Sequence, residues 1–261
     1  MAILTTEKVP TLDYWKFANK LEVGDYVFDK DGKVVRVTLV QEYHSKRCYT
    51  VELNDHLTVS GDENLALPTE NRKYRQRVTD HKGVFKFRRP LKPLKVAQLL
   101  EEQLKDHKNE LRFSVQTTKP LQYPHQDLPV PPFVFGYWFF NRRKNKKMTV
   151  KNECVIEKFK EFGYIPKFYG KSNYFTVTPT VESHLLPLIP TKIPNNVLFS
   201  SQEQRIELLS GIMLAKTRQY NKKTDTFRFS SRRFAVMQQI QCLAESLGIK
   251  TSSQHDKIRD T

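Results

Sequence analysis

Clusters of lysine and arginine with aromatic neighbours are the residues in this sequence whose types and spacing point to a definite chemistry. Residues 72–95 hold ten Lys and Arg against one acid, Asp80, with Tyr and Phe side chains between them. A second cluster fills residues 142–147, and a third extends from Lys216 to Arg233 around a single acid, Asp225. Clustered cations neutralise nucleic-acid phosphates and release their condensed counterions. The sequence therefore predicts a polyanion-binding surface, with a solvated charge run as the alternative for each cluster taken alone.

The cysteines and histidines show no spacing that indicates a metal site or a catalytic thiol. Cys48, Cys154 and Cys242 lie far apart without a CxxC pair, which argues against a disulfide scaffold or a structural zinc site. They fall in strand-like and helix-like segments, so we expect small core residues in a reducing compartment. The seven histidines are expected to be incidental. No metal and no cofactor is expected.

The overall charge agrees with these clusters. The 261 residues carry a formal net charge of +16, and the sequence pI is about 9.7. With 38% hydrophobic residues the chain is too apolar for disorder, so the excess charge is expected on a folded surface. No apolar stretch reaches the ~18 residues of a transmembrane helix, and the first ten residues lack the order of a signal peptide. We expect a soluble, cytoplasmic protein.

The first half of the chain reads as a small β unit followed by a helix. Residues 21–67 contain short β-branched and aromatic runs, two of which flank a hairpin turn at Asp31-Gly32. Residues 93–111 have the periodicity of a helix. Residues 117–132 are rich in proline, which continues neither a helix nor a central strand, so a domain boundary is predicted there.

The second half contains an internal repeat. An apolar helix with a central glycine, Gly136, returns 75 residues later around Gly211. Each copy is followed by a basic cluster, a strand-like segment and an amphipathic helix that ends at Gly163 or Gly248, both suited to a helix C-cap. A glycine inside a helix costs about 1 kcal/mol relative to alanine. That cost is explained if the two apolar helices pack backbone to backbone, as a pseudo-dimer.

Several segments together resemble one known family. Residues 20–33 and 49–67 are similar to the opening β-region and the next signature of the Hint splicing fold. The motif FGYWFFNR (135–142) and residues 192–217 resemble the two LAGLIDADG helices, and residues 226–253 resemble the strand and helix that follow the second one. The chain is thus similar over most of its length to inteins that carry a LAGLIDADG homing endonuclease, of phage or microbial type.

The resemblance implies an α+β fold: a LAGLIDADG pseudo-dimer of αββαββα-like repeats, preceded by a small all-β partial Hint domain. The Hint-like domain would occupy residues 1–92, with a basic DNA-binding extension at about 70–92. The helix and connector follow at 93–130, and the LAGLIDADG-like domain at 131–261. Few residues follow the last helix, so the second sheet is expected to lack a strand, left as an edge or completed by another protein chain.

Departures from the family pattern remove both of its activities. Splicing needs a Cys or Ser nucleophile at the start of the domain, a histidine in the second signature and a terminal His-Asn pair. The sequence shows none of the three, and Asn64 stands at the histidine position. Because an amide has no basic lone pair to act as a general base, splicing is not expected.

The nuclease chemistry is lost in the same way. In the family each LAGLIDADG helix ends in a carboxylate, and the pair holds the divalent metal ions that cleave DNA. Alignment of the glycines places Asn141 and Lys216 at these positions, where one offers a neutral oxygen and the other a repelling cation. Glu153 and Asp225 lie 12 and 9 residues beyond and are not expected to reach the site. We therefore expect no catalytic residue, no bound metal and no enzyme activity.

The expected function is sequence-specific binding of double-stranded DNA by a monomeric pseudo-dimer, as a transcriptional repressor or a blocker of another factor's site. If a phage encodes it, the protein would act in the host cytoplasm or nucleoid, without a membrane partner. The residues expected to contact DNA are Arg72, Lys73, Arg75, Arg77, Lys82, Lys86, Arg88, Arg89, Arg142, Arg143, Lys144, Lys146, Lys147, Lys216, Arg218, Lys222, Lys223, Arg228, Ser230, Arg232 and Arg233. Two alternatives stay open: a residual site-specific endonuclease, and a protein-interaction module on a relic scaffold.

Overall fold

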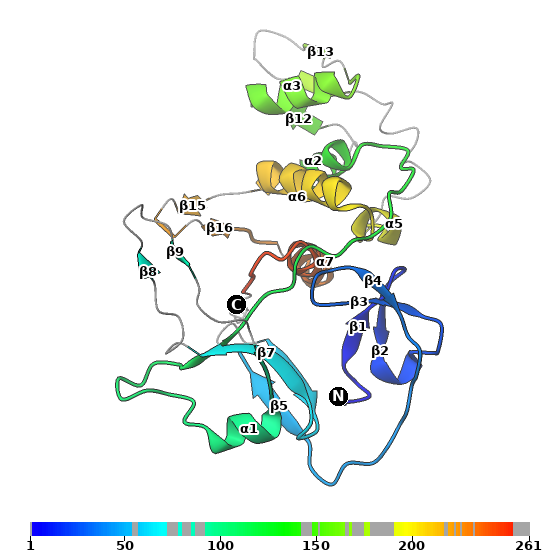
Figure 1. Cartoon of the computed structure of the whole chain (residues 1–261). Coiled ribbons are helices and arrows are strands. Elements are labelled where there is room, and N and C mark those ends of the chain that lie inside the picture. The colour runs from blue at the N-terminus through cyan, green and yellow to red at the C-terminus, as the bar shows by residue number, and fades with distance from the viewer. Residues whose placement is uncertain are drawn as a thin grey trace, which may run out of the picture.

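The structure of the chain, a computed structural model, describes residues 2–53, 57–71, 78–79, 85–86, 92–141, 148–150, 152–164, 167–168, 175–177, 191–216, 219–221, 223–224, 226–231 and 233–252. These residues form an α+β fold in which a group of helices adjoins several small antiparallel sheets (Figure 1). This confirms the α+β class expected from the sequence.

The N-terminal β unit consists of three short hairpins. They are formed by β1 (Lys8–Pro10) with β2 (Trp15–Phe17), β3 (Tyr26–Phe28) with β4 (Val34–Arg36), and β5 (Tyr49–Glu52) with β6 (Thr58–Gly61). A single 3-10 turn, η1 (Ala18–Lys20), follows β2. The predicted turn at Asp31-Gly32 is confirmed: Gly32 has a φ of +76°, which a glycine adopts without steric cost.

A second sheet follows, centred on β7 (Ala66–Asn71) with β10 (Lys92–Lys95) and β11 (Phe113–Val115) at its edges. The short antiparallel pair β8 (Val78–Thr79) and β9 (Phe85–Lys86) lies between β7 and β10 in the sequence. The helix predicted over 93–111 is wrong outside α1 (Val96–Glu101). Residues 92–95 pair with β7 instead, and the Asp106 carboxylate accepts hydrogen bonds from two later backbone N–H groups, which favours a turn over a helix.

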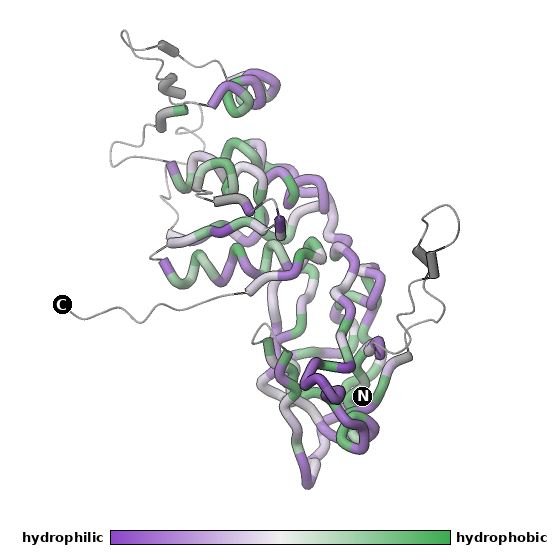
Figure 2. Tube along the Cα trace, turned by 90° about the vertical axis from the view of Figure 1, so that its left-hand side faces the viewer, coloured by the Kyte–Doolittle hydropathy of each residue, from purple (hydrophilic) through white to green (hydrophobic). Residues whose placement is uncertain are grey.

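The second half contains the helical core. It comprises α2 (Pro132–Asn141), β12 (Met148–Val150), α3 (Glu153–Glu161), β13 (Lys167–Phe168), β14 (Phe175–Val177), α5 (Asn195–Leu198), α6 (Gln202–Lys216), β15 (Gln219–Asn221), β16 (Thr226–Arg228) and α7 (Phe234–Ser246). The strands form two sheets, β12-β14-β13 and β15-β16. Residues 132–139 of α2 are all buried, and hydrophobic residues recur along the helices (Figure 2). Among the described helices, none has the length and apolarity to cross a membrane.

The order of elements repeats as the sequence predicted. Helix α2 is followed by β12 and α3, and helix α6 by the β15-β16 hairpin and α7. Gly163 and Gly248 follow α3 and α7 with φ values of +79° and +76°. Both glycines therefore end their helices in the left-handed conformation, which confirms the predicted C-caps.

The proline-rich connector is packed against both halves of the molecule. Its Leu121 and Tyr123 side chains are only 5% exposed. The Leu121 backbone N–H donates to the Ser246 carbonyl at the end of α7 (2.8 Å), and the next N–H donates to the Gly32 carbonyl in the β3-β4 turn (2.8 Å). A Cβ on Gly32 would collide with the backbone of this segment. The connector thus joins the β unit to the helices as a strap that is anchored by buried side chains.

An ion pair holds the β3-β4 turn on this strap and gives a pH-dependent stability. Lys119 and Lys30 bind the Asp31 carboxylate (2.8 and 3.0 Å) and lower its pKa to about 2. Because the folded-state pKa lies below the unfolded value of 3.8, the stabilisation is present above pH 4 and is lost as the pH falls towards 2. Urea midpoints measured across this window should fall less steeply for Asp31→Asn than for the wild type. The exposed control Asp13→Asn should keep the wild-type slope. If Asp31→Asn also keeps the wild-type slope, the assignment of the ion pair is contradicted.

Candidate nucleic-acid interface

Helices α2 and α6 contact each other backbone to backbone at their glycines. A Cβ added at Gly136 would lie 2.5 Å from the Leu208 carbonyl oxygen, and one added at Gly211 would collide with the Phe133 carbonyl oxygen. The two carbonyls are 75 residues apart, as the two glycines are. Each helix therefore presents the same surface to the other, which is the pattern of a two-fold symmetric interface within one chain. The predicted close packing of the two glycine-containing helices is confirmed.

Helix α7 shows that α2 and α6 run in the same direction. The Arg233 guanidinium, directly before α7, lies 5.6 Å from the ring centroid of Phe139 near the end of α2. Ser246, at the other end of α7, accepts a hydrogen bond from Arg205 near the start of α6 (2.8 Å). The 13 residues of α7 span about 20 Å, so the end of α2 and the start of α6 lie far apart. Since the helices cross at their glycines, their last residues lie at the same end of the pair.

This shared end carries no carboxylate from either helix. Asn141, half-buried, is the last residue of α2, and Lys216, described through its backbone, is the last residue of α6. Glu153 lies exposed in the first turn of α3, and Asp225 lies outside the described residues. Where the structure describes the chain, no group of three His, Cys, Asp or Glu side chains forms a metal-binding cluster.

The β15-β16 hairpin extends from the end of α6 and exposes polar and basic side chains. The register pairs residues 219–221 with 226–228 in antiparallel order. Lys223 lies exposed in the turn, and Thr226 and Arg228 are exposed on β16. These two residues point to one face of the hairpin because side chains alternate along a strand. Ser230, also exposed, follows two residues later. The hairpin therefore offers hydroxyl, ammonium and guanidinium groups to an external ligand.

The sequence places Arg228, Ser230 and Arg233 in or near the strand-like segment after the second apolar helix, but the structure keeps only Arg228 in the strand. Strand β16 ends at Arg228, and Arg233 occupies the N-cap position of α7. Between β16 and α7, the Phe229 ring packs edge-to-face on the Phe140 ring of α2, with the ring centroids 5.3 Å apart. This contact directs the chain after Arg228 toward α2 and ends the strand. Arg233 is exposed and stacks on a ring of α2, so it borders the shared helix end rather than the hairpin.

Most of the predicted DNA-contacting side chains lie where the structure gives no description. Lys86 and Lys216 are described through their backbones alone, in β9 and at the end of α6. The residues outside the described part are Arg72, Lys73, Arg75, Arg77, Lys82, Arg88, Arg89, Arg142, Arg143, Lys144, Lys146, Lys147, Arg218, Lys222 and Arg232.

Asn64, at the position the resemblance assigns to the splicing histidine, lies in a turn built around Asp62. The Asn64 backbone N–H donates to the Asp62 carboxylate (3.0 Å), and Lys95 Nζ donates to the Asn64 side-chain oxygen (3.2 Å). The Tyr43 hydroxyl donates to the same carboxylate (2.5 Å) and lowers the pKa of Asp62. The Asn64 amide thus contacts a cation and an anion. Tyr43 and Asp62 were not predicted from the sequence, although Asp followed by Asn two residues later favours this kind of turn.

The cysteines do not lie where the sequence predicted. Cys48 and Cys154 are exposed, and Cys242 is half-buried. Cys48 precedes β5 and Cys154 lies in the first turn of α3, so both occupy solvent-facing positions at the start of an element. The prediction that all three are core residues is therefore wrong for these two. Burial raises the pKa of the Cys242 thiol.

Comparison with known proteins gives one similarity to a DNA enzyme. No protein-family model matches the chain. A replicative DNA helicase, DnaB, of Mycobacterium intracellulare is 24% identical over 222 residues, which cover 81% of this chain. The chain spans 37% of the length of that helicase.

Proposed function

We propose that this chain is a sequence-specific duplex DNA-binding protein derived from an intein LAGLIDADG homing endonuclease, without cleavage or splicing activity. The observation that carries the proposal is the symmetric contact of α2 and α6, parallel helices that end together in Asn141 and Lys216. In the family that the sequence resembles, this end of the helix pair faces the DNA backbone. A transcriptional repressor or a blocker of another factor's site is the role that such binding would serve.

Electrostatics at the helix ends favours phosphate binding over metal binding. The C-terminus of a helix carries about half a negative charge, which repels a phosphate unless a cation lies beside it. Lys216 brings a fixed ammonium to the end of α6, and the basic cluster at 142–147 directly follows α2. Mg²⁺ needs hard anionic ligands, and neither helix ends in one. The basic residues therefore supply charge neutralisation that divalent ions supply in a nuclease.

The match to DnaB supports a DNA context without supporting helicase activity. By its name, that relative acts on DNA. Nucleotide-driven helicases hold ATP phosphates in a Gly-rich loop, and none of the nine glycines of this chain opens a G-x-x-x-x-G-K-[ST] pattern. The similarity therefore supports an origin in a protein that works on DNA, and it does not extend to helicase activity.

Substitution of Arg228 tests whether the hairpin reads DNA. If Arg228 makes a bidentate contact to a base, Arg228→Ala should weaken binding by about 1–3 kcal/mol and relax specificity at one base pair. Lys223→Ala, in the turn, should instead weaken binding to all duplexes and reduce the salt slope by about 0.9. Fluorescence anisotropy over a salt series measures both effects. Lys160 is an exposed lysine on α3, and Lys160→Ala is the matched control. If Lys160→Ala weakens duplex binding as much as Arg228→Ala does, the hairpin is not the element that reads DNA.

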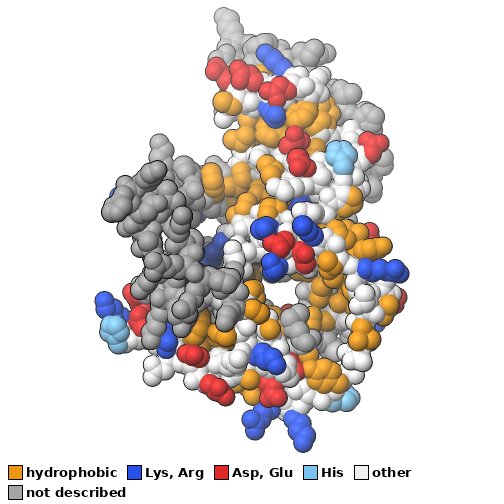
Figure 3. Space-filling view, in the orientation of Figure 1, with side chains coloured by type: hydrophobic (Ala, Val, Ile, Leu, Met, Phe, Trp, Pro, Cys, Tyr) orange, Lys and Arg blue, Asp and Glu red, His pale blue; other side chains and the backbone are white. Residues whose placement is uncertain are grey.

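A protein-interaction module is the second candidate, favoured by exposed apolar residues on the N-terminal β unit. Val23 and Leu39 are 63% and 67% exposed, and Tyr26 and Tyr43 are about half exposed; hydrophobic side chains are visible on this part of the surface (Figure 3). Exposed apolar side chains mark an interaction site where they lie together on the surface. In this case Leu39→Asp would abolish a stoichiometric protein complex that survives nuclease treatment and would leave duplex binding unchanged.

A further inference from the structure

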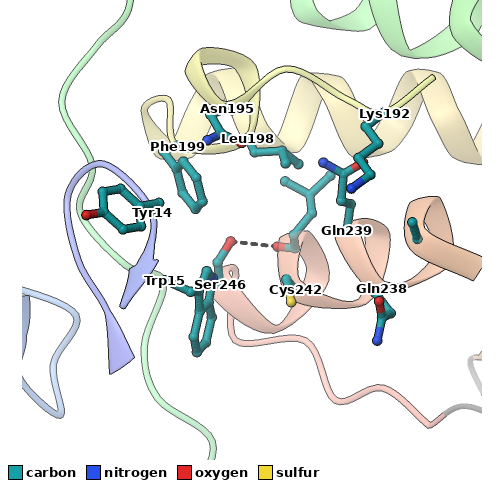
Figure 4. A pocket seen from close by; sticks show the side chains of 12 residues that line it. Tyr14, Trp15, Lys192, Asn195, Leu198, Phe199, Gln238, Gln239, Cys242 and Ser246 are labelled. Atoms are coloured by element: carbon teal, nitrogen blue, oxygen red, sulfur yellow. Dashed lines mark hydrogen bonds between the residues drawn. The ribbon is translucent and has the colours of Figure 1, made fainter. Parts of the chain in front are cut away.

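A cavity of about 320 Å³ lies between the N-terminal β unit and the helices (Figure 4). Tyr14 and Trp15 of the β1-β2 hairpin line one side, and Phe199, directly after α5, lines another. Cys242 and Leu243 of α7 complete the apolar wall. Ligand pockets have volumes of about 300–1,000 Å³ and often lie between structural units. The cavity is therefore large enough for a molecule of two or three aromatic rings.

Two of its polar side chains already form hydrogen bonds within the protein. The Gln239 amide donates to the Ile193 carbonyl and accepts from the Ile193 N–H, both at 2.8 Å. The Ser246 hydroxyl donates to the Leu243 carbonyl (2.7 Å) and accepts from Arg205. Each of these two groups makes two hydrogen bonds within the protein, which fixes it as part of the wall, and most of the other interior side chains are apolar.

The polar groups available to a ligand lie at the rim. Lys192, Asn195 and Gln238 line the cavity and are exposed. Within the described chain, the side chains of Asn195 and Gln238 make no hydrogen bond to protein. The lining residues, all of them described, include the Lys192 ammonium and no Asp or Glu. The cavity thus combines aromatic walls, one cation and two amides at its edge.

We propose that this cavity binds a small aromatic acid, with its ring between the hairpin and α7 and its anionic group at Lys192. The charge distribution favours an anion over a neutral or cationic ligand, because the lining carries one positive charge and no negative one. The aromatic and leucine walls favour a flat apolar body. Since such a ligand contacts both the β unit and the helices, its binding stabilises their contact by mass action. This proposal does not depend on DNA binding.

The test uses 1-anilinonaphthalene-8-sulfonate, a fluorescent aromatic sulfonate, and N-phenyl-1-naphthylamine, which has the same rings without the sulfonate. The full chain should bind the sulfonate saturably at one site and more tightly than the neutral amine. Lys192→Glu should weaken the sulfonate about tenfold, or ~1.4 kcal/mol, because attraction becomes repulsion. The exposed-site control Lys160→Glu should leave the affinity unchanged.

A second readout reports on the cavity itself. In a Cys48→Ser/Cys154→Ser background, where both exposed cysteines are removed, Cys242 is the remaining thiol. Sulfonate at a concentration that fills about 90% of the cavities should slow the reaction of Cys242 with 5,5′-dithiobis(2-nitrobenzoate) about tenfold in the full chain. Equal affinity of Lys192→Glu and wild type, tighter binding of the neutral amine, or an unprotected Cys242 would each overturn the proposal.

Discussion

Replacement of Arg205 by methionine is expected to lower the free energy of unfolding by about 3–5 kcal/mol. Arg205 is completely buried in α6, and its guanidinium donates to the carbonyls of Leu121, Ser200 and Ser246. Methionine keeps an unbranched apolar stem but is shorter and donates nothing. The Leu121 and Ser200 carbonyls therefore lose this buried donor, while the Ser246 carbonyl keeps the Leu121 N–H. Each unsatisfied buried group costs about 1–3 kcal/mol.

The position of these carbonyls explains why the effect should be large. They belong to the connector, to the segment before α6 and to the end of α7, so one side chain holds three segments together. Its guanidinium also lies 4.9 Å from the centroid of the Tyr123 ring, which itself contacts Phe28 of the β unit (4.7 Å). Burial lowers the pKa of Arg205 to about 10, so the group stays protonated at neutral pH.

Urea unfolding of Arg205→Met beside Arg228→Met measures this effect. Arg228 is exposed on β16, and its substitution should change stability by less than about 0.5 kcal/mol. A loss below about 1 kcal/mol for Arg205→Met would show that the buried hydrogen bonds do not hold the strap in place. An Arg205→Lys variant should recover part of the loss, because an ammonium supplies donors without the planar fork.

Alanine at Gly136 or Gly211 is expected to have the second large effect. The added Cβ would lie 2.5 Å from a carbonyl oxygen of the opposite helix at Gly136, and closer still at Gly211. The closest atoms that it meets are backbone, so relief requires the helices to separate. Overpacking of a core typically costs about 1–3 kcal/mol and sometimes more, and the upper end of this range or beyond is expected here. Duplex binding should fall as well, because separation moves the two helix ends apart.

Gly163→Ala is the matched control for these variants. Gly163 has a positive φ, but a Cβ there would meet no atom within 4 Å. Its substitution should therefore cost about 1 kcal/mol, the penalty of a left-handed alanine, with duplex binding intact. If all three alanine variants behave alike by urea unfolding, the helix pair does not depend on close backbone contact.

The features predicted correctly from the sequence depend on short local patterns that occur in both repeats. Glycines inside two apolar helices indicated the α2-α6 contact, because a glycine there destabilises a helix unless close packing requires it. Gly163 and Gly248 indicated the C-caps, because glycine is favoured directly after a helix. The helix over 93–111 was mispredicted since the pairing of 92–95 with β7 is a tertiary interaction. Arg205 was missed because an arginine in a helix normally faces solvent, and the carbonyls that bind it come from three different segments.

The candidate interface was predicted in part for the same reasons. The basic clusters and the positions Asn141 and Lys216 follow from the sequence and the resemblance. The placement of Arg233 does not, because it depends on the contact of Phe229 with Phe140, two residues far apart in the chain. The cavity beside Cys242 is likewise formed by the β1-β2 hairpin, α5 and α7, and no sequence pattern joins these elements.

Selection of duplexes from a random library by the full chain, with and without Mg²⁺, tests the proposed function most directly. Sequence-specific binding without cleavage predicts one long preferred site, intact DNA in both conditions and an affinity that falls steeply as salt rises. A site-specific double-strand break in Mg²⁺ would restore the nuclease as the function. Enrichment of no duplex, or affinity that does not change with salt, would contradict DNA binding itself.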